Sequence, residues 1–558
     1  MSMITIFGML KYRQQTPGED MTKEELLKLS VITNDIPLFE TLIKNEAVDL
    51  NWADEDGRTV LHWAAMMEHG YEFAKILIAL RADPRKQDKQ GHSPLSLAQS
   101  MKKERNAELL QEILSHPISL PPESTQFTAR FSPGAFTVLI VGGGMAGITA
   151  AYELIQKGYN VTLIEARERL GGRLETVYLD DTPVELGCQF IHGSKGNPLM
   201  PLIEKYKINF KPVTSAKRVI YDPEGKILDL ESISPFVKIA LKKIDAISKR
   251  RISNASKHLS QDESFFQYFI KNILTQGSIG VPNQKESLLL YKFGQTPDYQ
   301  GGNHLVTNGY NRLIEGLLQE AAHSGRLEIK LGHVVEKISE KHGKVYVYTK
   351  DHGHFEGDSI VCAVPLGVLK QNTIIFNPPL PHDKKRAIER LGMAIHDKII
   401  LQFDQAFWPE DVHYLNPYDY ENDMWREIVN LYHFSDGKIA ALSISSHADI
   451  AQLDKPDAVL VENALQMLKK IFGNNIPPLK YSMVTRWYQD PFSYGSYSYH
   501  TKESSLADNS ALAKPMGHIC FAGEHTSHFP SSLDGAYLSG VQAANEVIKL
   551  LHSDLKSV

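Results

Sequence analysis

Three glycines at fixed spacing, Gly142, Gly144 and Gly147, could hold the phosphates of a nucleotide. The G-x-G-x-x-G motif that they form follows a short apolar run, 138–141, and precedes an Ala-rich helical pattern. In this order the first glycine makes a tight turn, the second lets the backbone approach a pyrophosphate, and the third lets the helix pack close to the strand. The helix N-terminus adds N–H donors and a positive dipole. The motif predicts a dinucleotide site, without separating a nicotinamide from a flavin cofactor.

A carboxylate and a second glycine turn support this prediction. The next apolar run, 161–164, ends on Glu165, which lies 18 positions after Gly147. An acid that holds a ribose hydroxyl is expected at about 20 positions. A Leu-Gly-Gly-Arg turn follows at 170–173. A lone G-x-G-x-x-G is weak evidence, but here the strand, the helix and the acid are in register, which disfavours an ordinary glycine-rich loop.

The Leu-Gly-Gly-Arg turn resembles the second glycine motif of FAD-containing amine oxidases. The resemblance extends over almost everything from about Thr137 to Leu551, and it is closest to polyamine and spermine oxidases and to lysine-specific histone demethylases. It implies that the cofactor is FAD. Monoamine oxidases attach flavin through a Cys in the segment that here reads Gly-Ser-Tyr at 495–497, so the absence of a Cys there implies noncovalent FAD.

The resemblance also assigns residues to the cofactor. Arg167 and Arg173 match ribose and phosphate contacts, and Val335 lies where the family places a valine whose backbone pairs with the adenine. Glu524 would contact the ribityl–pyrophosphate part, and Leu533 would set a backbone N–H against the flavin ring. The expected cofactor-binding residues are Gly142, Gly144, Gly147, Glu165, Arg167, Gly172, Arg173, Val335, Trp487, Glu524 and Leu533.

Lys398 is the residue with the most chemical interest. It lies in a predicted apolar strand of alternating type, 398–403, where burial of an ammonium is unfavourable unless it is paired. It matches the family lysine that hydrogen-bonds a water at the flavin N5 atom. The alternative is a lysine whose head group reaches solvent from a strand end. The surrounding motif favours a catalytic role.

Aromatic and histidine side chains would complete the substrate site. Trp487 matches the tryptophan beside the flavin, and Tyr497 matches one wall of an aromatic cage that suits an amine. His192 matches the active-site histidine of spermine and polyamine oxidases, and we expect it to be catalytic with Lys398. Taken singly, such aromatic residues are often core residues, and a lone histidine is more often structural.

Two departures from the family pattern concern the substrate. The opposite wall of the cage falls near Ser531 and Ser532, which are small and would open the pocket, as in the demethylases. The chain nevertheless lacks the SWIRM-like domain and the long coiled-coil insertion of those enzymes. Relatives that bind polyamines or peptides line the entrance of the substrate site with carboxylates, and in the matching segment of this chain only Asp298 remains. Spermine itself is therefore in doubt as the substrate.

The expected reaction is oxidation of an amine C–N bond with O₂ as the acceptor and H₂O₂ as a product. One alternative is a protein-binding protein with an inactive flavin scaffold. Another is a different flavoenzyme, such as a desaturase or a protoporphyrinogen oxidase. A nicotinamide dehydrogenase explains neither the second glycine turn nor Glu524.

The N-terminal part contains a repeat with an offset of 34 residues. Asp54-x-x-Gly57-x-Thr59-x-Leu61 recurs as Asp88-x-x-Gly91-x-Ser93-Pro94-Leu95. This pattern resembles ankyrin repeats, with two clear copies and one partial leading copy over 22–115. So short a stack buries little core. We therefore expect it to bind a partner protein or to dock on the rest of the chain.

Composition limits the class of protein. At 558 residues the chain is too long for one core. A net charge of −6 argues against a nucleic-acid partner, and three scattered cysteines predict neither a disulfide framework nor a metal site. The expectation is a cytoplasmic protein without a signal peptide, a membrane span or a C-terminal anchor.

The order of predicted strands and helices indicates an α/β fold with a Rossmann-like FAD-binding part, preceded by the small all-α ankyrin domain. The predicted segments are 1–21, an N-terminal segment; 22–115, the ankyrin domain; 116–134, a Pro- and Ser-rich linker; 135–215, 303–375 and 515–555, the FAD-binding domain; and 216–302 and 376–514, the substrate-binding domain.

Overall fold

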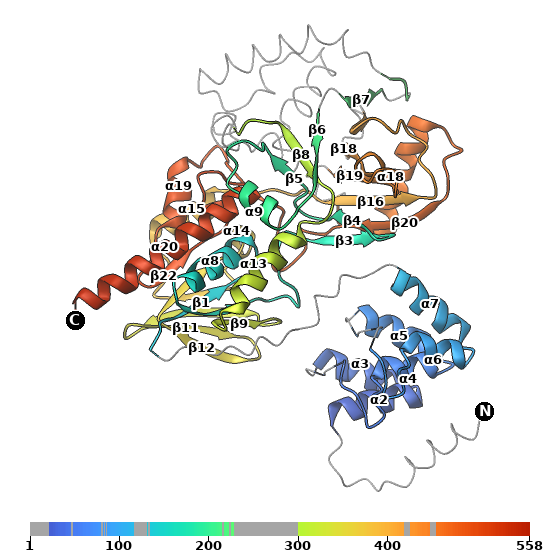
Figure 1. Ribbon diagram of the computed structural model, residues 1–558, viewed down its shortest axis with the longest axis horizontal. Helices are drawn as coiled ribbons and strands as arrows, with labels where there is room; N and C mark the ends of the chain where they lie inside the picture. Colours follow the sequence, from blue (N-terminus) through green and yellow to red (C-terminus); the bar gives the residue numbers. More distant parts are fainter. Residues whose placement is uncertain are drawn as a thin grey trace. The chain divides into compact units, whose positions relative to one another are not determined.

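The chain folds as two compact units, Met1–Leu120 and Pro121–Val558 (Figure 1). The structure is a computed structural model that describes residues 22–45, 48, 50–79, 82, 84, 86–115, 131, 134–214, 217–222, 225–227, 299–417, 425–446 and 453–557. The predicted segment 1–21, nearly all of the predicted linker 116–134, and residues 228–298 of the predicted substrate-binding domain, including Asp298, lie outside these ranges.

Three successive pairs of helices make up the first unit. They are α2 (Lys23–Thr33) with α3 (Ile36–Asn45), α4 (Val60–Met66) with α5 (Gly70–Ala79), and α6 (Pro94–Ser100) with α7 (Glu104–Ser115). Neighbouring pairs pack on one another through α2, α4 and α6 around one apolar core that contains Leu61, Leu77 and Leu110. The leading copy, which the sequence predicts as partial, also forms a helix pair.

The same turn precedes the second and third pairs, 34 residues apart. Asp54 Oδ1 accepts hydrogen bonds from the N–H groups two and four residues further on, and Asp88 Oδ1 does the same. Gly57 and Gly91 have φ of 80° and 82°, a left-handed conformation that favours glycine. The sequence repeat is therefore a repeat of structure.

A five-stranded parallel sheet forms the base of the second unit. Its order is β22 (Ile519–Phe521), β13 (Ser359–Cys362), β1 (Thr137–Val141), β2 (Asn160–Ile164) and β9 (Leu327–Lys330). Four of the five strands, all but β9, are buried over nearly their whole length, which is typical of a parallel sheet covered on both faces. The strands come from three distant parts of the chain, so this sheet is discontinuous; the exact domain boundaries stay a prediction.

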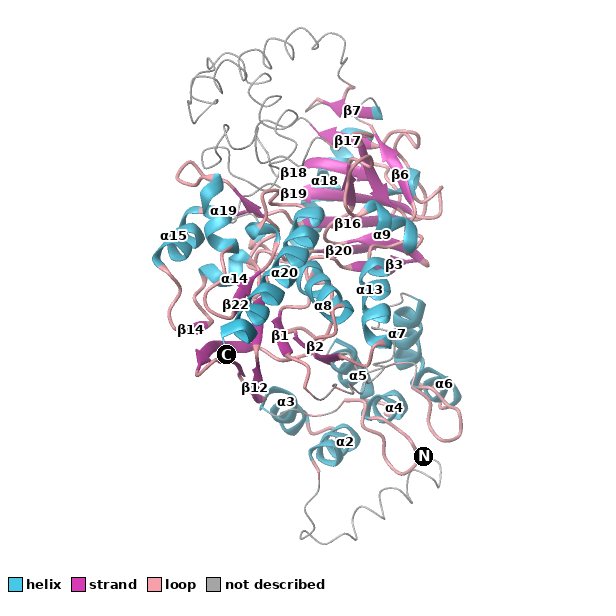
Figure 2. Ribbon diagram, turned by 60° about the vertical axis from the view of Figure 1, so that its left-hand side comes forward, coloured by secondary structure: helices cyan, strands magenta, loops and turns pink. Residues whose placement is uncertain are grey.

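Helices α8 (Met145–Gln156), α13 (Asn311–His323) and α20 (Leu533–Ser557) pack together beside this sheet (Figure 2). A Cβ atom added at Gly540 would lie 2.4 Å from the Ala146 carbonyl oxygen, so α20 approaches α8 closely. The other described helices of this unit are α9 (Met200–Lys205), α14 (Leu366–Lys370), α15 (His382–Arg390), α16 (Leu431–Phe434), α18 (Asp457–Phe472), α19 (Leu506–Ala513) and the 3₁₀ helix η4 (Glu524–Thr526). Among the described helices, none has the length and apolar character that a membrane crossing requires.

The described residues of this unit also form four smaller sheets. The four-stranded sheet has the order β12 (Gly353–Gly357), β11 (Lys344–Thr349), β10 (Val335–Lys341) and β14 (Ile375–Asn377). The three-stranded sheet has the order β5 (Phe190–His192), β8 (Asn303–Val306) and β6 (Phe210–Val213). Strands β3 (Thr176–Leu179) and β4 (Thr182–Glu185) form a hairpin, and β15 (Gly392–Met393) pairs with β21 (Ser498–Tyr499).

A six-stranded sheet positions Lys398. Its order is β20 (Leu479–Val484), β16 (Lys398–Phe403), β19 (Ala440–Ser446), β18 (Trp425–Asn430), β17 (Tyr414–Pro417) and β7 (Arg218–Tyr221). The predicted strand 398–403 is confirmed as β16, but its expected alternating character is wrong, because the strand is covered on both faces and all six of its residues are buried. Helix α18 packs on this sheet, and the apolar core between them includes Leu401, Leu442 and Leu460.

Candidate active site

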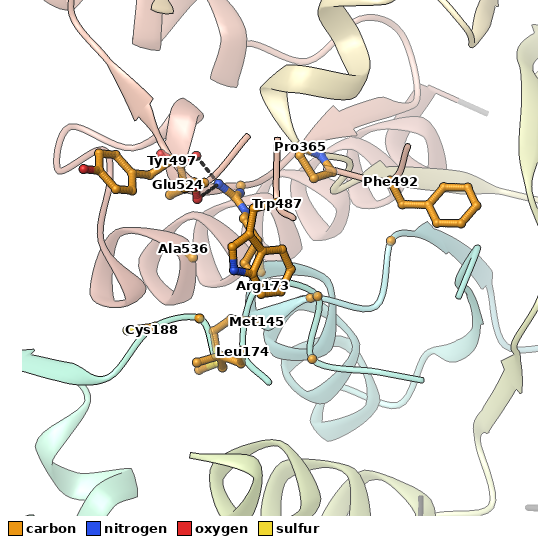
Figure 3. Close-up of a pocket in the computed structure, with 18 of the residues that line it drawn as sticks. Met145, Arg173, Leu174, Cys188, Pro365, Trp487, Phe492, Tyr497, Glu524 and Ala536 are labelled. Carbon is orange, nitrogen blue, oxygen red and sulfur yellow. Dashed lines mark hydrogen bonds and ion pairs between the residues drawn. The ribbon is translucent and has the colours of Figure 1, made fainter. Parts of the chain in front are cut away.

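One cavity of about 540 Å³ brings the predicted site residues together (Figure 3). Its lining includes both glycine turns, the start of β10, the segment before α20 and part of the six-stranded sheet. Every predicted site residue lines it except Gly147. Gly147 lies in the first turn of α8 and packs against the end of β1, where an added Cβ atom would be 1.9 Å from the Gly142 carbonyl oxygen. Its predicted use in close helix–strand packing therefore agrees with the geometry.

The two glycine turns touch at the N-terminus of α8. Gly171 N–H donates to the Gly143 carbonyl oxygen at 2.8 Å, and Gly144 forms an isolated bridge with Gly171. Gly144 is the N-cap of α8 and has no side chain to satisfy the first N–H groups of the helix. Gly142, with φ of 105°, makes the turn out of β1. These open donors at a helix start suit an anionic group such as a pyrophosphate.

Glu165 lies at the end of β2 and is 4% exposed. Its Oε2 accepts the Gly143 N–H at 2.6 Å, and its Oε1 accepts the Arg167 N–H at 2.8 Å. Arg167 in turn binds Asp490 at 2.6 Å, a carboxylate that the sequence interpretation missed. The carboxylate of Glu165 thus holds the turn in shape, and its contact with a ribose stays a prediction.

Arg173 and Glu524 form an ion pair across the cavity wall at 2.9 Å, drawn as a dashed line in Figure 3. Glu524 also accepts hydrogen bonds from the Ser498 hydroxyl at 2.6 Å and from the Ser531 N–H at 2.8 Å. Burial opposes the charge of Glu524, but Arg173, His525 and these donors hold its pKa below the usual value. Arg173 and these hydrogen-bond donors therefore compensate the negative charge of Glu524. This end of the cavity can accordingly accept a phosphate-containing dinucleotide.

Lys398 is buried, 4% exposed, and its ammonium has three acceptors. They are the carbonyl oxygens of Glu185 at 3.1 Å and Gly187 at 2.6 Å, and Gln189 Oε1 at 3.1 Å. An ammonium has three N–H donors, so the position of its nitrogen is fixed. Burial lowers the pKa of Lys398 to about 8, opposed by the nearby Glu185, Cys188 and Glu427. This geometry excludes the alternative in which the Lys398 head group reaches solvent from the end of the strand.

Trp487 is held on two sides. Its backbone N–H donates to Asp397 Oδ1 at 2.7 Å, and its Nε1 donates to the Leu186 carbonyl oxygen at 3.3 Å. Burial raises the pKa of Asp397 to about 6, against hydrogen bonds from Trp487, Thr485 and Tyr488. Figure 3 shows the indole between Tyr497 and Phe492 in that view. The indole plane is thereby preorganised as a wall of the cavity.

His396 is a cavity residue that the sequence interpretation missed. Its ring lies 6.0 Å from the Tyr497 ring, and its Nε2 is 3.1 Å from Ser445 Oγ. Burial, aided by Lys398, lowers the pKa of His396 to about 3, so the ring is neutral. Its position two residues before Lys398 could have predicted this, because residues i and i+2 of an extended segment share a face.

His192, on β5, has its Nδ1 3.2 Å from Asn303 Oδ1. Burial lowers its pKa, so the imidazole is neutral near pH 7, while Asn303 and the buried Asp534 oppose this shift. Asp534 lies in the first turn of α20, and it too was missed by the sequence interpretation. The structure places His192 in the cavity wall; its catalytic role stays a prediction.

Ser531 and Ser532 are small, as the open pocket requires, but their hydroxyls are occupied. Ser531 has φ of 66° and donates its hydroxyl to the Ser498 carbonyl oxygen. Ser532 Oγ accepts the Gly535 N–H at 3.0 Å and donates to the Phe529 carbonyl oxygen at 3.0 Å. The first of these bonds is typical of a helix N-cap. Both serines therefore position the start of α20, where Leu533 begins the helix.

A family model described as flavin containing amine oxidoreductase matches residues 145–548, and a model of ankyrin repeats in three copies matches residues 16–120. Polyamine oxidase 2 of Arabidopsis thaliana is 31% identical over 445 residues, which cover 74% of this chain and 87% of the relative. Polyamine oxidase 4 of Oryza sativa subsp. japonica is 30% identical, covering 74% and 88%.

Lysine-specific histone demethylase 1 homolog 1 of Arabidopsis thaliana is 30% identical over 452 residues, which cover 74% of this chain but 52% of that relative. The part that the family model matches contains the second glycine turn, Lys398 and Glu524. The family implies a flavin cofactor, and the open helix start and the paired carboxylates of the cavity fit one. The chain belongs to the flavin-containing amine oxidoreductases, with ankyrin repeats at its N-terminal side.

Proposed function

We propose that the protein is a FAD-dependent oxidase of primary or secondary amines. The amine, O₂ and water would give an aldehyde, the residual amine or ammonia, and H₂O₂, by way of an imine. One observation carries the proposal: a single cavity joins the two glycine turns to Lys398, Trp487 and Tyr497. Relatives named as polyamine oxidases support an amine as the substrate class.

The residues that would hold FAD all line the cavity, except Gly147. The start of α8 at Gly144 would bind the pyrophosphate, and Arg173 with Glu524 would bind the adjoining polar chain. Val335, at the start of β10, would meet the adenine, and the N–H of Leu533 would meet the flavin ring. A bound flavin supplies the two-electron acceptor that oxidation of a C–N bond requires.

The chain offers no reactive thiol to attach the flavin. Among the described residues, Cys188 is the cysteine that lines the cavity. Burial raises the pKa of its thiol to about 12, so the nucleophilic thiolate is absent near neutral pH. This supports noncovalent binding, and acid precipitation of the purified protein should release the yellow colour into the supernatant.

The side chains around the reacting amine have separate tasks. Trp487 and Tyr497 would hold the amine and exclude water from the reacting carbon. Lys398 would place a positive charge, fixed by its three acceptors, beside the reacting atoms. That charge favours the neutral form of a bound amine, which is the form that can lose hydrogen from carbon. Neutral His192 could accept a proton or a hydrogen bond from the substrate nitrogen.

A peroxide-coupled screen of amines on purified holo-protein tests the function. We expect yellow protein whose absorbance bleaches when an amine is added without O₂ and recovers with O₂, yielding H₂O₂. A flavin that no amine bleaches would contradict the proposal. It would favour the protein-binding or desaturase alternatives instead.

The rate should depend on pH in a defined direction. Below about pH 8 Lys398 is charged, and a protonated substrate is repelled by it and cannot react. We therefore expect kcat/KM for a simple monoamine to rise from pH 6 towards pH 8, as the substrate loses its proton, and to fall above about pH 8, where Lys398 loses the charge that the reaction uses. A Lys398→Met variant should lose the fall above pH 8 and keep, at its much lower rate, the rise that belongs to the substrate. A flat profile over this range would contradict the assignment.

We further propose that the ankyrin unit binds a protein, either a separate partner or the second unit of this chain. Its three helix pairs share a single small core, which supports recognition over catalysis. Cross-linking of the full chain followed by mass spectrometry separates the two cases. Specific links between the units support docking within the chain, and their absence supports a separate partner.

A further inference from the structure

The six-stranded sheet brings three polar side chains into one row on the cavity side. The register pairs Lys398 of β16 with Ser445 of β19, and Ser445 with Glu427 of β18. Directly opposed residues in neighbouring strands point to the same face, and all three line the cavity. Because strands lie ~4.8 Å apart, Glu427 is about 10 Å along this row from Lys398.

The carboxylate of Glu427 has one oxygen available to the cavity. Glu427 is 9% exposed, and its Oε2 lies 3.3 Å from Arg218 Nη2. No residue that the structure describes donates a hydrogen bond to its Oε1. Arg218 stacks over the Tyr414 ring at 4.5 Å and does not line the cavity. The cavity therefore meets the carboxylate and the ring, and not the guanidinium.

The neighbours of Glu427 suit a cation. Ser445 adds a hydroxyl, and the neutral His396 bound to it has a buried Nδ1 without a partner among the described residues. The Tyr414 ring beside Arg218 also lines the cavity, and the Tyr497 ring lies 6.0 Å from the His396 ring. A buried carboxylate beside aromatic faces and neutral polar groups is the chemistry that binds an ammonium.

We propose that Glu427, with Ser445 and His396, forms a subsite for a second ammonium group of the substrate. The proposal rests on the proposed amine oxidation and adds which amines are preferred: those with a second cationic nitrogen on the same chain. The reacting C–N bond would lie at the Lys398 end of the row, and the second nitrogen at the Glu427 end.

A length series on the wild-type holo-protein tests the subsite. We expect kcat/KM for straight-chain diamines to exceed that for monoamines of equal length by about 10- to 100-fold, since a charge-assisted hydrogen bond is gained. The diamine series should also show an optimum length, where the second nitrogen reaches Glu427. Equal kcat/KM values with no optimum would overturn the proposal.

Variants test the residue itself. Glu427→Gln should reduce the diamine-to-monoamine ratio to within about 3-fold of unity, because the amide has no charge to offer. Asp436→Asn removes an exposed carboxylate that pairs with Lys211 away from the cavity, and it should keep the wild-type ratio. Glu427→Gln also leaves Arg218 without its carboxylate partner, so the double variant Glu427→Gln/Arg218→Met provides a second test. We expect the same fall in its diamine-to-monoamine ratio of kcat/KM. An unchanged ratio in both Glu427 variants would overturn the proposal.

Calorimetric binding of a diamine separates this proposal from the oxidase proposal. Holo-protein that binds a diamine through Glu427 but oxidises no amine would refute the oxidase and support the subsite. Holo-protein that oxidises monoamines and diamines equally well would support the oxidase and overturn the subsite.

Discussion

Replacing Lys398 by Met is expected to lower the rate of flavin reduction by an amine at least 100-fold, in a protein that folds and keeps its flavin. The ammonium is fixed by three acceptors within 3.1 Å. Methionine keeps the volume but removes the charge and the donors. Loss of one preorganised charged group at a reacting centre typically costs 10²–10³ in rate. Rapid mixing of enzyme and amine without O₂ measures the step directly.

Lys384 offers a matched control, because it is also a buried lysine with three acceptors, in this case all backbone carbonyl oxygens. Its Nζ donates to the carbonyl oxygens of Ala511, Leu512 and Lys514 at 2.9, 2.6 and 2.8 Å. Burial lowers its pKa to about 8, as for Lys398, but it does not line the cavity. Lys384→Met should lower the unfolding temperature and leave the rate per bound flavin unchanged. Retention of more than a third of the wild-type rate in Lys398→Met would contradict the assigned role.

The glycine turns and the ankyrin turns could be predicted because their determinants are local. Gly142, Gly144 and Glu165 act within one strand–turn–helix–strand stretch, and Asp54 Oδ1 accepts backbone N–H groups at most four residues away. Such patterns are visible in a single sequence. The same is true of strand 398–403, because its own apolar residues are enough to predict where the strand begins and ends.

The polar environment of Lys398 could not be predicted, because its partners are distant in sequence. Its three acceptors come from residues 209 to 213 positions earlier. Glu427 enters the cavity because β18 pairs with β19 in one particular register, and a shift of one residue would turn it to the other face. Asp534 and Asp490 likewise depend on how α20 and the loop after Trp487 pack. Tertiary pairing, and not local pattern, decides these positions.

Replacing Gly144 by Asp is expected to give a folded protein without flavin. Gly144 has an ordinary φ of −81°, and an added Cβ atom would meet nothing closer than 3.9 Å. Aspartate is a favourable N-cap residue, so α8 should be as stable as before or more so. The same carboxylate would face the pyrophosphate, and two charges 4 Å apart repel by about 4 kcal/mol at an effective dielectric constant of 20. Flavin affinity should therefore fall roughly 1,000-fold or more.

The ratio of absorbance at 450 nm to that at 280 nm after gel filtration measures the bound flavin, and thermal unfolding of the apo-protein measures the fold. Gly144→Ala is the matched control, because it adds the Cβ atom without the charge and should keep most of the flavin. A yellow Gly144→Asp protein with the wild-type ratio would show that the start of α8 does not hold the phosphates. A colourless Gly144→Ala protein would show that steric contact, and not charge, governs the site. Loss of colour in Gly144→Asp alone, with an unchanged or raised unfolding temperature, identifies the first turn of α8 as the anion site on which the rest of the cavity depends.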